Sequence, residues 1–142
     1  MQPVPLIVCE RYGRWAMAIR RLLGNEAEVR ETRGPVDLRQ ELAALPESLV
    51  AMELGALPLS ALCDFLAEME RAFPLSAAVI LGEADVARHA ALLLETGAIL
   101  CLDSPRRLAP LVAIARRQRA RAPRRDASLV ERIWARLPLG SD

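Results

Sequence analysis

Short apolar runs that alternate with longer amphipathic stretches constrain the fold of this chain more than any other feature. The continuous apolar runs cover residues 4–9, 48–53, 77–81 and 98–102. Runs of this length with no polar face are typical of strands that are buried on both sides. A further run, at 27–32, alternates Val29 with charged residues, as an edge strand does. We therefore predict five strands.

The stretches between these runs repeat their apolar residues at helical spacing. We predict helices over residues 14–23, 35–45, 58–73 and 85–96, and a last core helix that Ser104 and Pro105 begin and that runs through Ala115. The predicted inward-facing residues are Trp15, Ile19, Leu22 and Leu23 in the first helix and Val86, Ala90, Leu93 and Leu94 in the fourth. Strand–helix units in this order imply a mostly parallel sheet with right-handed crossovers. The predicted fold class is α/β, a doubly wound three-layer α/β/α arrangement with strand order 2-1-3-4-5.

The last part of the chain differs in character, so we divide the chain into a domain at 1–122 and a basic linker with a short helix at 123–142. Residues 116–125 hold six arginines. A capping box at 128–131 then opens an amphipathic helix. Its apolar side chains, named here the terminal stripe, are Val130, Ile133, Trp134 and Leu137. A helix this short is not stable alone in water, so we expect it to dock either on its own domain or on a protein partner.

Composition excludes several kinds of chemistry. The chain has no lysine, which rules out mechanisms that need a lysine amine. Its three cysteines form no CxxC pair, so neither a zinc site nor a redox motif is indicated. The turn at 10–14 lacks a glycine-rich phosphate motif, and His89 lies mid-helix without an orienting partner. We predict no catalytic residue, cofactor or metal.

The N-terminal residues 1–7 carry no basic region before their apolar stretch, so they do not indicate a signal peptide. No apolar run approaches the roughly 20 residues that a membrane helix needs. We expect a cytoplasmic protein without a membrane partner.

Residues 4–122 resemble the receiver domain of two-component response regulators. The resemblance rests on the five strand–helix units, on an alanine- and leucine-rich helix that ends in Gly97-Ala98, and on Pro105 after the fifth strand. It implies the flavodoxin-like fold, a role in signalling, and possible pairing of two copies through residues 85–115.

The resemblance fails at the positions where receivers accept a phosphoryl group. The positions that match this pocket hold Cys9, Glu10, Glu53, Gly82 and Ser104. Receivers have a pair of acids where this chain has Cys9-Glu10, an aspartate at Glu53, a hydroxyl residue at Gly82 and a lysine at Ser104. Glu53 is longer than aspartate by one methylene, and a misplacement of about 1 Å can cost roughly 100-fold in rate. We therefore predict a non-catalytic signalling or adaptor module that acts by protein association without phosphorylation. Glu53 is either a permanent negative charge at the acceptor position or a solvated residue at the end of its strand.

Two other functions remain open from the sequence. The arginines of 116–125 could bind phosphate groups or nucleic acid, since clustered arginines neutralise a phosphate backbone. Glu10, Glu53 and Asp103 should lie at one edge of the sheet, where three carboxylates could hold Mg²⁺. Against the metal site, Glu10 could instead pair with Arg11 or Arg14.

Overall fold

A computed structural model describes residues 2–121, which form five parallel strands and the helices that connect them. The strands are β1 (Val4–Cys9), β2 (Ala27–Thr32), β3 (Leu49–Glu53), β4 (Ala77–Leu81) and β5 (Leu100–Leu102). The α-helices are α1 (Arg14–Leu23), α2 (Pro35–Ala44), α3 (Leu59–Ala72), α4 (Ala84–Thr96) and α5 (Ala109–Arg121), and the short 3-10 helix η1 (Gly24–Glu26) follows α1. The strand order is β2-β1-β3-β4-β5, which confirms the predicted fold class and topology.

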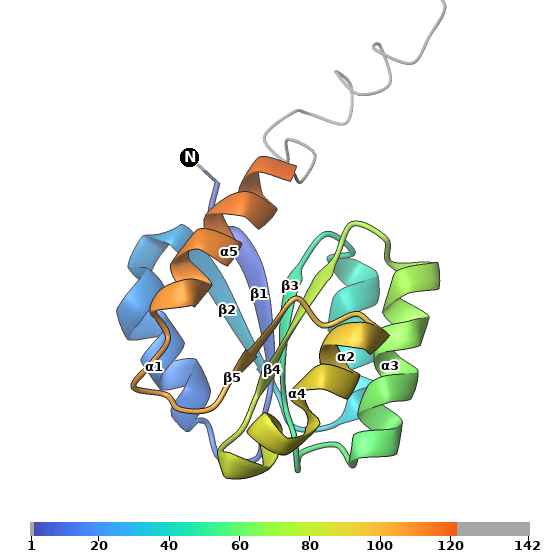
Figure 1. The fold of residues 1–142 in the computed structure, drawn as a ribbon. Coiled ribbons are helices and arrows are strands. Elements are labelled where there is room, and N and C mark those ends of the chain that lie inside the picture. The colour runs from blue at the N-terminus through green and yellow to red at the C-terminus, as the bar shows by residue number, and fades with distance from the viewer. Residues whose placement is uncertain (1, 122–142) are drawn as a thin grey trace, which may run out of the picture.

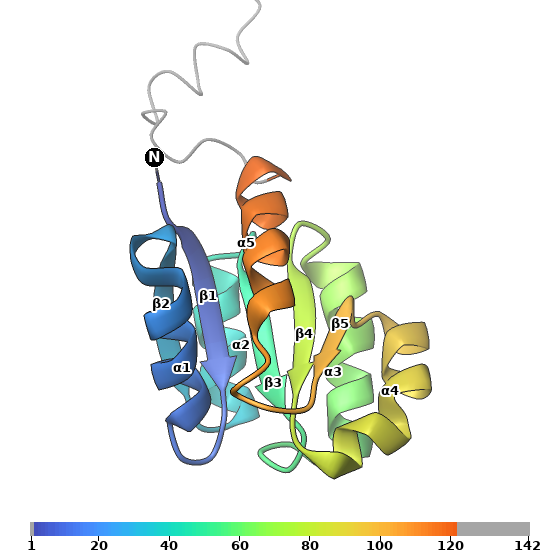
Figure 2. The same cartoon turned by 60° about the vertical axis from the view of Figure 1, so that its left-hand side comes forward.

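The helices cover both faces of the sheet. Helices α1 and α5 lie on one face, and α2, α3 and α4 lie on the other (Figures 1 and 2). Successive side chains of a strand point to opposite faces, so each central strand contributes to two cores. On β1, Ile7 and Cys9 join the core under α2 and α3, whereas Leu6 and Val8 join the core under α1 and α5.

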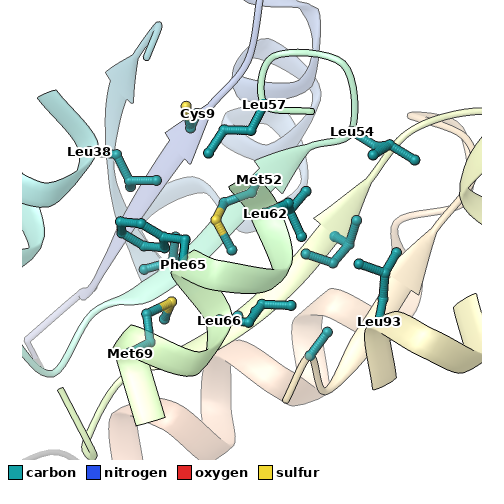
Figure 3. Close-up of a cluster of buried hydrophobic side chains, with 14 of the residues drawn as sticks. Cys9, Leu38, Met52, Leu54, Leu57, Leu62, Phe65, Leu66, Met69 and Leu93 are labelled. Carbon is teal, nitrogen blue, oxygen red and sulfur yellow. The ribbon is translucent and has the colours of Figure 1, made fainter. Parts of the chain in front are cut away.

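The core between α3 and the sheet is drawn in Figure 3, which shows Leu62, Phe65, Leu66 and Met69 on α3 beside Met52 of β3. The sequence predicts an apolar face for this helix made of Leu59, Leu62, Leu66, Met69 and Phe73, and three of these residues, Leu62, Leu66 and Met69, are buried. Phe65 does not belong to that predicted set, yet it is buried. It completes an apolar stripe wide enough to cover the sheet.

Two leucines predicted to face inward are exposed. Leu22 of α1 and Leu94 of α4 keep 39% and 47% of their surface open to solvent. Each is adjacent to a buried leucine, Leu23 in α1 and Leu93 in α4. Because adjacent residues lie about 100° apart around a helix, only one of each leucine pair can point directly at the sheet.

The last core helix begins later than Ser104-Pro105. The Ser104 hydroxyl accepts the N–H of Arg106 at 3.1 Å, and its carbonyl accepts the N–H of Arg107 at 3.1 Å. These bonds close a turn and do not cap a helix, because α5 starts only at Ala109. The predicted N-cap role of Ser104 is therefore wrong. Of the four residues predicted to face inward in this helix, Leu108, Leu111 and Ala115 are buried and Val112 is half-buried.

No helix within residues 2–121 is long and apolar enough to cross a membrane. The terminal stripe and the basic linker, which together make up residues 123–142, lie outside the described residues, so their predicted structure stays a prediction.

Candidate functional site at the carboxyl edge of the sheet

The five positions that match the receiver acceptor pocket lie together at the carboxyl edge of the sheet. Cys9 and Glu53 end β1 and β3, Glu10 and Gly82 directly follow β1 and β4, and Ser104 follows β5. Backbone pairing continues here, since the N–H of Gly82 donates to Leu102 at 3.0 Å. In parallel α/β sheets this edge is where ligands bind, so the topology places the candidate residues correctly.

The carboxylate of Glu53 is buried and already bound by Arg11. Its Oε1 accepts the main-chain N–H of Arg11 at 2.9 Å and the Nε–H of the same residue at 3.1 Å. This contact with Glu53 raises the pKa of Arg11. The description of Glu53 as a solvated residue is therefore wrong, and its negative charge is balanced by an arginine from the loop after β1.

Gly55 makes room for that arginine. A Cβ atom at Gly55 would lie 3.0 Å from Cζ of Arg11, and the backbone there has φ +115°, which side-chain-bearing residues rarely adopt. The guanidinium therefore lies against the bare backbone of the β3–α3 loop. Its other side faces Tyr12, whose ring centroid is 5.5 Å from Cζ. Arg11 thus joins the loops after β1 and β3.

The carboxylate of Glu10 caps helix α1. It is fully buried, and its two oxygens accept the main-chain N–H groups of Trp15 at 2.9 Å and Ala16 at 2.7 Å. The residue at the N-cap position of α1 is Gly13, which has no side chain to satisfy these donors. A negative charge is also favoured at this end of the helix dipole. The acid that the resemblance would assign to a metal is used here to begin a helix.

Gly82 has no space for a hydroxyl side chain. A Cβ atom there would lie 2.0 Å from Cγ2 of Val86 in the first turn of α4. Val86 is itself buried in the core under α4. A serine or threonine could therefore stand at position 82 only if the start of α4 moved.

Cys9 is an inert thiol. Burial is the largest cause that raises the pKa of Cys9 above its ordinary value of 9.0, and the nearby Glu53 adds to the effect. A raised pKa makes the thiol less reactive, because the thiolate is the nucleophilic form. It packs as a small apolar residue in the core under α2 and α3.

The three-carboxylate metal site is not formed. No group of three or more His, Cys, Asp or Glu side chains within the described part of the chain could hold a metal ion. Glu10 and Glu53 are turned to different backbone donors, and Asp103 is exposed. The hypothesis of a magnesium site at Glu10, Glu53 and Asp103 is therefore wrong.

Sequence reasoning missed the part played by Arg11. It paired Glu10 with Arg11 or Arg14, whereas Arg11 binds Glu53 and Arg14 forms an ion pair with Glu83. A usable signal was present, because Arg11 directly follows the end of β1 and Gly55 follows the end of β3. The pairing itself depends on how the loop after β1 crosses the end of β3, which only the tertiary structure decides.

The first arginines of the basic run contact the domain itself. Arg116 Nε lies 3.0 Å from Oε1 of Glu26, and Arg119 Nη2 lies 3.7 Å from the same atom. These ion pairs tie α5 to the 3-10 helix η1. Two members of the run therefore already have an acidic partner, and Arg124 and Arg125 lie outside the described residues.

No family model and no curated protein matches the sequence. Solved structures do match. A pilus assembly-related protein from Burkholderia pseudomallei superposes with a TM-score of 0.64 at 20% identity, over 88% of this chain and 95% of that one. A CheY-like protein, tadZ, from Pseudomonas aeruginosa gives 0.66 at 14% identity, over 81% of this chain and 98% of the other. A pilus assembly protein, cpaE, from Burkholderia thailandensis gives 0.59 at 19% identity over the same shares. The chain thus has the receiver-like, flavodoxin-like fold that its sequence pattern indicated.

Proposed function

We propose that this chain is a non-catalytic, cytoplasmic module with the receiver fold that acts through protein association and accepts no phosphoryl group. One observation carries the proposal. The carboxylate of Glu53 already accepts hydrogen bonds from the main chain and the side chain of Arg11. An acceptor carboxylate must be free to attack phosphorus. Glu53 is held by a neighbouring loop instead.

The remaining requirements of phosphoryl transfer support the same proposal. The reaction depends on positioning and on neutralising charge with metal ions and cations. Both carboxylate oxygens of Glu10 accept hydrogen bonds from main-chain N–H groups of helix α1, and position 82 has no space for a hydroxyl side chain. The sequence also contains no lysine.

Incubation of the full chain with acetyl phosphate and Mg²⁺, followed by intact-mass measurement, tests this proposal. We expect no gain of mass in the wild type. The matched control is Glu53→Gln, which removes the one carboxylate at the acceptor position. A gain of one phosphoryl group in the wild type that Glu53→Gln abolishes would overturn the proposal.

We place the partner contact on the terminal stripe, because an amphipathic helix of this length needs an apolar surface to dock on. The names of two structural neighbours indicate which partners to test first, namely components of a pilus-assembly system. Affinity capture from the native host should recover such a component with the full chain and lose it with Trp134→Glu. Ala135→Glu, on the opposite side of the predicted helix, should retain it. Equal recovery with both variants would remove the stripe from the interface.

A second association surface is proposed on α4, where two copies of the chain would meet. Leu92 and Leu94 are large apolar residues of this helix, and both stay about half exposed. The two residues lie about 200° apart around the helix, so they do not share one face. The proposed pairing is supported by the resemblance to receivers, in which the matching segment, residues 85–115 here, meets a second copy.

A further inference from the structure

A groove opens at the amino edge of the sheet, opposite the carboxyl edge that holds Glu10 and Glu53. It has a volume of about 270 Å³ and lies between the end of α3, the end of α4 and the start of β4. Its wall combines the apolar side chains of Leu66, Met69 and Phe73 from α3 and of Ile99 from the turn before β5 with the charged side chains of Glu70 and Arg121. We call it the amino-edge groove.

Its size fits side chains better than a cofactor. Pockets for small molecules usually enclose about 300–1,000 Å³ and combine apolar walls with several convergent polar groups. This groove is smaller than that, and Leu66 and Met69 at its base are almost completely buried. An occupant that inserts one or two large apolar side chains matches it.

The course of the chain brings one such occupant to the groove. Arg121, the last residue of α5, lines the groove itself. Its position is fixed one turn earlier by the buried Gln118, whose Nε2 donates to the carbonyls of Glu47 at 2.8 Å and Leu75 at 2.6 Å. The chain therefore leaves the described domain at the rim of the groove.

The segment after Arg121 carries apolar side chains that could pack against the apolar part of the groove. Val130, the first residue of the terminal stripe, comes nine positions after Arg121. Nine residues can span up to about 30 Å, which is ample for a return to the groove. A short tether also gives the attached segment an effective concentration of order millimolar, which favours it over a second copy.

We propose that the amino-edge groove holds the terminal stripe of the same chain, with Trp134 as the inserted side chain. Docking removes from water both the apolar side chains of the groove and the apolar face of the short helix. For regulation, the inference rests on the proposed function: a stripe seated in the groove cannot contact a partner, so a partner has to displace it. The docked state itself needs no partner.

Fluorescence quenching of Trp134 in the full chain tests this docking. The signal of Trp134 is the difference between the wild type and Trp134→Phe, since the only other tryptophan, Trp15, is buried in the core. We expect Trp134 to be shielded from iodide in the wild type at every protein concentration. Ile99→Glu places a charge in the groove and should shift the equilibrium toward release by at least about tenfold.

Met17→Glu is the matched control. Met17 is 55% exposed and Ile99 is 44% exposed, but only Ile99 lines the groove. The control should leave Trp134 shielded. Should Ile99→Glu fail to give the wild-type circular dichroism spectrum, Leu137→Glu in the stripe replaces it with the same expected release.

Equal quenching of Trp134 in the wild type and in Ile99→Glu would overturn the proposal. So would shielding that disappears on dilution, because that result assigns the groove to the stripe of a second copy. These outcomes are independent of the capture experiment. Failure of docking and failure of the partner proposal can therefore be told apart.

Discussion

Gly82 follows the last residue of β4, and the small space beside its Cα decides which residues can stand there. Gly82→Ser forces a Cβ atom toward Val86, 2.0 Å from the present position of its Cγ2. Overpacking of this kind costs about 1–3 kcal/mol. We expect the urea midpoint of Gly82→Ser to fall accordingly, with no phosphorylation gained.

The control for this substitution is Gly34→Ser. Nothing lies within 4 Å of a Cβ at Gly34, which occupies the N-cap of α2 with extended backbone. Serine is a good N-cap residue, so this change should be neutral or stabilising by a few tenths of a kcal/mol. If both variants lose the same stability, the clash with Val86 is not the reason.

Glu10 is a buried residue whose whole contribution is to begin helix α1. Glu10→Gln replaces one accepting oxygen with an NH₂ group that faces a main-chain N–H donor. An unsatisfied buried group costs about 1–3 kcal/mol, and we expect that loss in the free energy of unfolding measured with urea. Glu83→Gln, which affects only the exposed ion pair with Arg14, should change stability by less than about 1 kcal/mol. A loss of equal size in both variants would remove the capping role.

Helices α2 and α3 are linked by one bidentate ion pair. Arg39 donates to both oxygens of Glu68, at 3.0 and 2.8 Å, and its guanidinium also lies 5.4 Å from the ring centroid of Phe65. The hydrogen bonds from Arg39 lower the pKa of the Glu68 carboxyl below its ordinary value. The pair is at the surface, so its contribution is at most about 1 kcal/mol.

The sign of the pH dependence follows from that lowered pKa. The contribution of the pair is complete above the pKa of an unfolded glutamate, about 4.3, and is lost as the pH falls through the lower pKa of the folded state. We expect the stability difference between the wild type and Glu68→Gln to be greatest near neutral pH and to shrink in acid. Asp64→Asn, an exposed acid of α3 without an ion pair among residues 2–121, should show no such trend. A constant difference for Glu68→Gln would contradict the assignment.

Helix α5 shows how one polar residue can fix an element that has few apolar contacts near its end. Gln118 is buried, and its amide joins the loops before β3 and β4. The sequence analysis described this part of α5 as a basic run, because residues 116–125 hold six arginines and Gln118 lies among them. The burial of Gln118 becomes evident only when the ends of β3 and β4 are seen side by side.

At the scale of the whole molecule, the proposed pairing of two copies makes α4 the surface to test. Leu94→Glu places a charge at an exposed apolar position of this helix, and we expect it to raise the dimer dissociation constant by about tenfold or more in sedimentation equilibrium. The control is Val36→Glu, an equally simple change at an exposed apolar residue of α2. A wild type that stays monomeric across the concentration series would exclude this surface.

The fold could be predicted almost completely because it depends on local patterns. The four buried runs, the alternating edge strand and the helices each carry a recognisable local pattern. The bounds of β1, α1, β2 and β4 agree with the expected residues. The start of α5 could not be predicted, because the turn at Ser104 competes with helix formation through bonds to Arg106 and Arg107.

The sequence by itself determined the α/β architecture, the strand order and the set of residues at the carboxyl edge, since apolar periodicity and chain connectivity are properties of the sequence. Only the tertiary structure decided how those residues are used. Whether Glu53 meets solvent, a metal or Arg11 depends on which loop crosses it, and whether position 82 can hold a hydroxyl depends on where α4 packs. Both the partner of Glu53 and the space at position 82 depend on contacts between residues that are distant in the chain, so no local sequence pattern could predict them.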